Sequence, residues 1–128
     1  MFLSAENMLG GYGETTILND CSISVKKGEI AVIVGPNGAG KSTAMKAIFG
    51  MLDLKAGNII FDGKDITSLK PQERVKSGMG FVPQTHNVFT SMTVMENLEI
   101  GGFTNQEYLS KNISEVFKLF PVLEEKQK

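Results

Sequence analysis

The residues best suited to chemistry lie in one stretch, Gly35-Pro36-Asn37-Gly38-Ala39-Gly40-Lys41-Ser42-Thr43, which fits the pattern G-x-x-x-x-G-K-[ST]. Its glycines let the backbone turn tightly and approach a phosphate, with successive N–H groups directed inward. Lys41 can reach β- and γ-phosphates, and the Ser42 hydroxyl can ligate Mg²⁺. The expected phosphate-binding residues are Gly35, Asn37, Gly38, Ala39, Gly40, Lys41, Ser42 and Thr43.

The segments on either side of this loop have the character that phosphate binding requires. Glu29–Val34 is a short apolar, β-branched run, which predicts a buried strand. Residues 43–49 favour a helix that ends at Gly50, and its N-terminal end would add positive charge to the loop. The alternative is a glycine-rich turn that binds nothing, but a Lys-Ser pair has no use in such a turn.

Length and composition restrict the class of protein. A chain of 128 residues is long enough for one domain with a hydrophobic core, and its net charge of −1 does not favour nucleic acid as a partner. Cys21 is the only cysteine, which excludes an internal disulfide and fits a reducing compartment. The sequence contains no signal peptide and no apolar stretch that could span a bilayer, so we expect a cytoplasmic chain.

The first two thirds of the chain is predicted to be rich in strands. Residues 2–8 and 21–25 are predicted strands with a loop at Gly10–Gly13 between them, and Met79–Val82 is a further short strand. Residues 57–61 and 64–66 form a predicted hairpin across the Asp62-Gly63 turn. Pro71 and Gly78 bound a short helix over residues 71–77.

The last third is predicted to be helical. Thr93 with Glu96, and Thr104 with Glu107, each fit a capping box that opens a helix. The second helix has an apolar face and is ended by Pro121. The residues of that face are Leu109, Ile113, Val116, Phe117 and Phe120.

Several further segments complete a pattern that resembles the ATP-binding subunit of an ABC transporter, and most of all the importer ATPases for branched-chain amino acids. Besides the glycine loop, which has the family's form of Walker A, the matching segments are Gly10–Gly13, Gly57–Ile66, Gly80–Gln84 and Thr93–Leu98. The resemblance covers nearly the whole chain in the family's order. It implies an α/β fold of the P-loop NTPase type, with ATP and Mg²⁺ as cofactors and a membrane permease subunit as the partner.

The resemblance also implies roles for two residues outside the loop. Tyr12 would stack on the adenine ring, and Gln84 would meet Mg²⁺ together with Ser42. Each has a simpler alternative, because Tyr12 could be an ordinary loop tyrosine and Gln84 a surface glutamine at the end of a strand. His86, the only histidine, is expected to be a loop residue without a catalytic part.

The family pattern includes parts that these residues lack: the Leu-Ser-Gly-Gly-Gln signature, Walker B with its catalytic glutamate, and the switch histidine. We therefore expect the chain to be the N-terminal half of an ABC ATPase, truncated before the signature, that binds nucleotide and is a very poor hydrolase on its own. Its parent would use ATP to drive amino-acid transport at the cytoplasmic face of the inner membrane.

We expect one partial domain over residues 1–128, with a strand-rich part at 1–84 and the start of a helical subdomain at 85–128. The core sheet would be incomplete, leaving Ile30–Val34 with unpaired edges that recruit strands from within the chain or from a second copy. A non-catalytic, self-associating interaction module with a vestigial phosphate loop is the alternative function. Another P-loop enzyme, such as a small kinase, is disfavoured by the resemblance that continues through Gln84 to Leu98.

Overall fold

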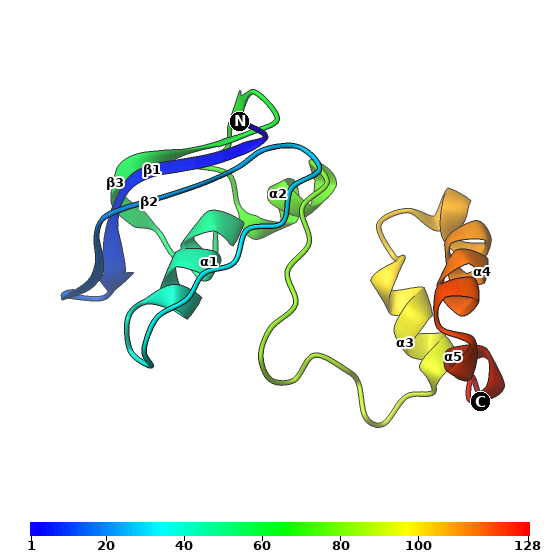
Figure 1. Cartoon of the computed structure of the whole chain (residues 1–128). Helices are drawn as coiled ribbons and strands as arrows, with labels where there is room; N and C mark the ends of the chain where they lie inside the picture. Colours follow the sequence, from blue (N-terminus) through cyan, green and yellow to red (C-terminus); the bar gives the residue numbers. More distant parts are fainter. The chain divides into compact units, whose positions relative to one another are not determined.

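Four antiparallel strands near the N-terminus pair in the order β2-β1-β3-β4 (Figure 1). The structure is a computed structural model that describes all residues from 1 to 128. The chain divides into two compact units, residues 1–81, which contain the sheet, and residues 82–128, which are helical.

The first hairpin is longer than its sequence predicts. Strand β1 spans Leu3–Tyr12 and β2 spans Thr15–Val25, with Leu3 opposite Val25 and Tyr12 opposite Thr15. The predicted loop at Gly10–Gly13 is therefore wrong, because the first three of its residues belong to β1. Cross-strand pairing outweighs the local preference of glycine for turns here.

The second hairpin agrees with its prediction. Strands β3, Leu54–Phe61, and β4, Lys64–Asp65, meet across the Asp62-Gly63 turn. The ring of Phe61 makes an edge-to-face contact with Phe2 at a centroid distance of 4.9 Å. The predicted short helix also forms as α2, Pro71–Lys76, where the N–H of Lys70 donates to the Glu73 carboxylate at 3.0 Å.

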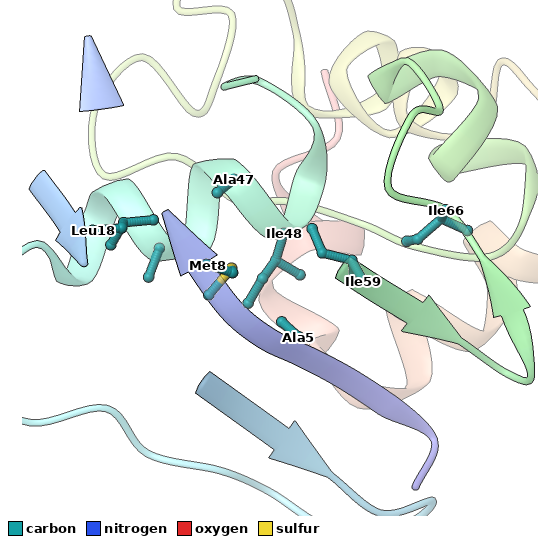
Figure 2. Close-up of a cluster of buried hydrophobic side chains, with 8 residues drawn as sticks. Ala5, Met8, Leu18, Ala47, Ile48, Ile59 and Ile66 are labelled. Atoms are coloured by element: carbon teal, nitrogen blue, oxygen red, sulfur yellow. The ribbon is translucent and has the colours of Figure 1, made fainter. Parts of the chain in front are cut away.

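Helix α1, Lys41–Phe49, packs its buried face against this sheet and ends at Gly50 as predicted. Figure 2 shows the resulting core, in which side chains of α1 meet those of β1, β2 and β3. The core residues are Ala5, Met8, Leu18, Ala44, Ala47, Ile48, Ile59 and Ile66. Burial of each larger apolar side chain stabilises the fold by about 1.5–3 kcal/mol, so the core holds α1 firmly on the sheet.

The predicted buried strand at Glu29–Val34 is wrong. The segment has no regular secondary structure, and Ile30, Val32 and Val34 are 93%, 78% and 84% exposed. No strand of the sheet pairs with it, and a strand is not stable without a pairing partner. The expected exposure of apolar side chains is thus found, whereas the expected pairing with other strands of the same chain is not. Met79–Val82 forms no strand for the same reason.

The second unit consists of three α-helices and a short 3₁₀ helix. They are α3, Val94–Gly101, η1, Gln106–Tyr108, α4, Leu109–Leu119, and α5, Pro121–Glu125. None of these helices contains a fully buried residue, and no helix of the structure is both long enough and apolar enough to cross a membrane.

One of the two predicted capping boxes forms. The N–H of Thr93 donates to Glu96 at 2.7 Å, and the N–H of Glu96 donates to the Thr93 hydroxyl at 3.2 Å. The box predicted at Thr104 and Glu107 is wrong, because α4 begins only at Leu109 and has no side-chain cap. The 3₁₀ turn takes the place of its first turn. Pro121 ends α4 as predicted and occupies the first turn of α5.

Candidate functional site

The glycine-rich loop reaches α1 through Gly40, which is the N-terminal cap of that helix. Its φ of 92° lies in the left-handed region, which a side chain disfavours. A Cβ added there would lie 3.1 Å from the Cγ2 of Ile17, so strand β2 approaches the loop closely at this point. The core anchors α1 and β2, and these two elements in turn position the loop.

The loop encloses a pocket of about 280 Å³. The structure therefore brings together most of the residues that the sequence predicts for phosphate binding. The pocket is lined by Ile17, Pro36, Asn37, Gly38, Ala39, Gly40, Lys41, Ser42 and Thr43. Gly35 belongs to the same group through its carbonyl, which accepts a hydrogen bond from Lys41.

Lys41 directs its ammonium group back over the loop. Nζ donates to the carbonyl oxygens of Gly35 and, at 3.0 Å, of Pro36. Both acceptors are neutral, whereas a phosphate oxygen carries negative charge and would attract the ammonium group by direct Coulomb interaction as well. A phosphate in the pocket would therefore compete well for this cation.

The first turn of α1 leaves donors free for an anion. No side chain caps the helix, and its first turn contains no acidic residue. The first N–H groups of a helix have no partner within the helix, and they carry the positive end of its dipole. Ser42 is exposed, whereas Thr43 is buried against the core. The Ser42 hydroxyl is thus the one that remains available to a metal ion.

Tyr12 lies at the end of β1, outside the residues that line the pocket. Its ring is 47% exposed, and the Nζ of Lys46 lies 6.0 Å from the ring centroid. This cation–π contact joins the end of the first hairpin to the middle of α1. Exposure of the ring leaves room for stacking on a base.

Gln84 belongs to the second unit, which is described by itself, and its side chain is exposed. His86 is also exposed, in a left-handed conformation with φ of 55°. The structure contains no group of three or more His, Cys, Asp and Glu residues that could hold a metal ion. A magnesium site here would instead rely on the Ser42 oxygen and on phosphate oxygens, which is a common arrangement for Mg²⁺.

Besides Pro36, which stands within the predicted loop but not among its expected binding residues, sequence reasoning missed two residues of this region. Ile17 lines the pocket, and Lys46 contacts Tyr12. Neither stands next to its partner in the sequence, and neither belongs to a motif. The periodicity of a strand or a helix could place each residue on a face, but could not indicate which residue it meets.

The chemistry available in the pocket is the stabilisation of a polyanion. The pocket is lined by the glycine loop, by Lys41 and by the first residues of α1, and its lining has no carboxylate. Such an arrangement is a ready-made phosphate site. The pocket residues by themselves offer no general base for activating a water molecule.

Comparison with known proteins gives a consistent result. The family model described as ABC transporter matches residues 18–128. A probable branched-chain amino acid transport ATP-binding protein, LivF of Archaeoglobus fulgidus, is 44% identical over 114 residues, which is 88% of this chain and 48% of LivF. A high-affinity branched-chain amino acid transport ATP-binding protein, BraG of Pseudomonas aeruginosa, is 36% identical over 97% of this chain and 54% of its own length.

A solved structure is similar as well. It is an ATP-binding cassette of an ABC transporter in its ADP conformation, with a TM-score of 0.72 and 41% identity over 81% of this chain and 41% of the other. The chain spans about half the length of the curated relatives that it matches.

Proposed function

This chain belongs to the ABC transporter family of ATP-binding proteins, and from that premise we propose that its glycine loop binds ATP with Mg²⁺. The family and the α/β fold of the P-loop NTPase type agree with the sequence prediction and are confirmed. The pocket at the N-terminus of α1, with Lys41 above it, is the observation that supports the proposal most strongly.

In this proposal each residue of the loop has a defined part. The loop from Gly38 to Thr43 surrounds the phosphates, with its free backbone N–H groups on their oxygens, and Lys41 leaves its carbonyl partners to neutralise the terminal phosphates. Gly35, Asn37 and Ala39 shape the loop. The ring of Tyr12 stacks on adenine.

Mg²⁺ has its own proposed ligands. The exposed Ser42 hydroxyl serves the ion, which neutralises phosphate charge when it is bound. The Gln84 amide oxygen is a second ligand that the family pattern proposes. Oxygen is the ligand type that this hard cation prefers. Gln84 carries the weaker support of the two, since it rests on the family pattern alone.

The activity of the parent protein is proposed from the relatives. Both curated relatives named above are described as branched-chain amino acid transport ATP-binding proteins. We propose that the parent supplies ATP-driven amino-acid import, bound to a permease subunit at the cytoplasmic face of the membrane. The proposed partners are nucleotide, the permease subunit and a second copy of the chain, and nucleic acid is not among them.

Nucleotide-titration calorimetry with Lys41→Ala tests the binding proposal. Loss of a charged hydrogen-bond donor costs about 1.5–3 kcal/mol, so affinity for ATP–Mg²⁺ should fall by roughly 10- to 100-fold. Lys55→Ala is the matched control, because it removes an exposed lysine from β3 on the other side of the core. Equal affinity of the Lys41 variant and the wild type would place the nucleotide elsewhere.

The same samples report on turnover. These 128 residues contain no Leu-Ser-Gly-Gly-Gln sequence, and the pocket offers no general base. Phosphate release by the wild-type chain should therefore equal that of the Lys41→Ala variant. Turnover of about 1 s⁻¹, at the low end for ordinary enzymes, would contradict this expectation.

Self-association is the second candidate function, and the apolar residues at positions 30, 32 and 34 favour it. The side chains of Ile30, Val32 and Val34 are exposed on a segment without pairing partners. Exposed apolar segments with unpaired backbone recruit partners. This candidate is compatible with nucleotide binding, because the glycine loop begins only after Val34.

A further inference from the structure

Arg74 is the only arginine of the chain, and only 2% of its surface is exposed. It belongs to α2, yet its guanidinium group reaches the C-terminal end of α1. Nη1 donates to the carbonyl oxygens of Ala47 at 3.1 Å and of Ile48 at 2.7 Å. These are two of the last carbonyls of α1, of which Ala47 also accepts a hydrogen bond from the N–H of Gly50 at 3.1 Å.

The other donors of the guanidinium group bind the segment that leads from β4 into α2. Nη2 donates to the Thr67 carbonyl at 2.9 Å, and Nε donates to the Leu69 carbonyl at 2.9 Å. One planar side chain thus connects the end of α1 to the segment that follows the sheet. Only arginine presents several donors in a rigid fork that can satisfy this set of acceptors.

Gly50 makes room for this contact. It is the C-terminal cap of α1, with φ of 86°. A Cβ at this position would lie 2.7 Å from Nε and 2.9 Å from the guanidinium carbon of Arg74, so any larger residue would displace the arginine. The helix end and the guanidinium group are therefore fitted to each other.

The charge of Arg74 suits its position. Burial lowers the pKa of the guanidinium group and the nearby Asp53 raises it, but arginine remains charged in proteins. A cation at the C-terminus of a helix interacts favourably with the negative end of the dipole. Arg74 thus stabilises the end of α1 that lies opposite the glycine loop.

We propose that Arg74 is a positioning residue for the phosphate site. Arg74 holds the C-terminal end of α1 in place and thereby fixes the direction of the helix axis. That direction determines where the N–H groups of the first turn point. Binding of a phosphate chain by preorganised donors requires their placement to within about 0.5 Å. This inference rests on the proposed function, since it concerns the same pocket.

The test is an amide NMR titration of the full ¹⁵N-labelled chain with ATP–Mg²⁺ and, separately, with AMP. Arg74→Lys keeps the charge but not the fork, and Arg74→Met removes both. Gly50→Ala is a second variant, because its Cβ would meet the guanidinium group, although it also strains the left-handed cap of α1. Lys76→Met is the matched control, since it removes an exposed cation from the same helix α2.

Weaker binding of the longer phosphate chain is the expected result. Arg74→Lys and Gly50→Ala should weaken ATP–Mg²⁺ about tenfold, the scale of one lost hydrogen bond to a charged group. The affinity for AMP, which would make fewer contacts with the loop, should change by less than about twofold. A change of that size is what mutations at independent, non-interacting sites show. Lys76→Met should bind both nucleotides as the wild type does.

Other results separate the two proposals. A wild-type chain whose loop amides do not shift with ATP–Mg²⁺ contradicts the proposed function itself. If the wild type binds but Arg74→Lys binds equally well, only the positioning role is wrong. The role is also wrong if ATP–Mg²⁺ and AMP lose affinity by the same factor, or if both Arg74 variants lose the dispersed signals of β1–β3, because Arg74 would then serve the fold in general.

Discussion

Lys41 donates to two carbonyls of its own loop, whereas Tyr12 meets a cation from the middle of α1. In both cases the side chain is held by contacts that a nucleotide would replace or extend. The Lys41 ammonium group can exchange neutral acceptors for charged ones, and Tyr12 keeps nearly half of its ring exposed. In the proposed function the two residues would make separate contributions, Lys41 to phosphate binding and Tyr12 to binding of the base.

Tyr12→Ala should weaken the binding of ATP–Mg²⁺ through loss of base stacking, which is worth about 1–3 kcal/mol per base. Tyr12→Phe should retain nearly all of the affinity, because stacking needs the ring and not the hydroxyl. The measurement is calorimetry with ATP and with inorganic triphosphate. Triphosphate should bind equally well to the wild type and to both variants, and a loss of triphosphate binding in Tyr12→Ala would show that the residue acts on the loop instead.

Thr67 connects the two strands of the second hairpin through hydrogen bonds of its hydroxyl and its N–H. Its hydroxyl donates to the Asp65 carboxylate at 2.6 Å, and its N–H donates to the same oxygen at 2.9 Å. The N–H of Ile59 in turn donates to the Thr67 hydroxyl at 2.8 Å. The side-chain and backbone hydrogen bonds from Thr67 lower the pKa of Asp65 below its ordinary value of 3.8.

This pKa direction predicts how stability depends on pH. Because the carboxylate form of Asp65 is favoured in the folded state, its contribution is fully present above about pH 3.8 and is lost as the pH falls below that value. Asp65→Asn should make unfolding less dependent on pH in this acid range. Urea unfolding from pH 2.5 to 6 is the measurement.

Asp62→Asn is the control for this experiment, because it removes a neighbouring carboxylate of the same turn. The Asp62 side chain makes no hydrogen bond in the structure, and asparagine tolerates its positive φ of 47°. This variant should therefore keep the acid dependence of the wild type. An Asp65→Asn chain that loses stability with acid as steeply as the wild type would contradict the role of Thr67.

In the molecule as a whole, residues 29–34 form an apolar segment that pairs with no strand of the sheet. The core between α1 and the sheet is formed without it, and its alternate apolar side chains are exposed. Val34 leads directly into the glycine loop, so pairing of this segment with another chain would fix the residue next to the proposed phosphate site. Partners for the segment would thus affect both proposed functions.

Val32→Lys should reduce self-association of the chain, because a charge on this exposed, unpaired segment opposes its pairing with another chain. The measurement is sedimentation velocity across a concentration series. Val88→Lys, which makes the same change at an exposed site in the second unit, should associate as the wild type does. A wild-type chain that remains monomeric at every concentration would refute self-association.

Local chemistry in the sequence was sufficient for several features. The end of α1 at Gly50, the Asp62-Gly63 hairpin and the capping box at Thr93 were predicted correctly from neighbouring residues, whereas α1 begins at Lys41, two residues before its predicted start. Each depends on hydrogen bonds or backbone conformations that span only a few positions. The family was also readable from the sequence, since its motifs occur in a fixed order.

Only the tertiary structure decided which distant residues meet. It extended β1 and β2 through the predicted loop, left residues 29–34 unpaired, and placed Lys46 beside Tyr12 and Arg74 at the end of α1. These outcomes depend on pairing and packing between segments far apart in the chain. An apolar, β-branched run favours a strand, but the strand forms only where a neighbouring strand is available to pair with it.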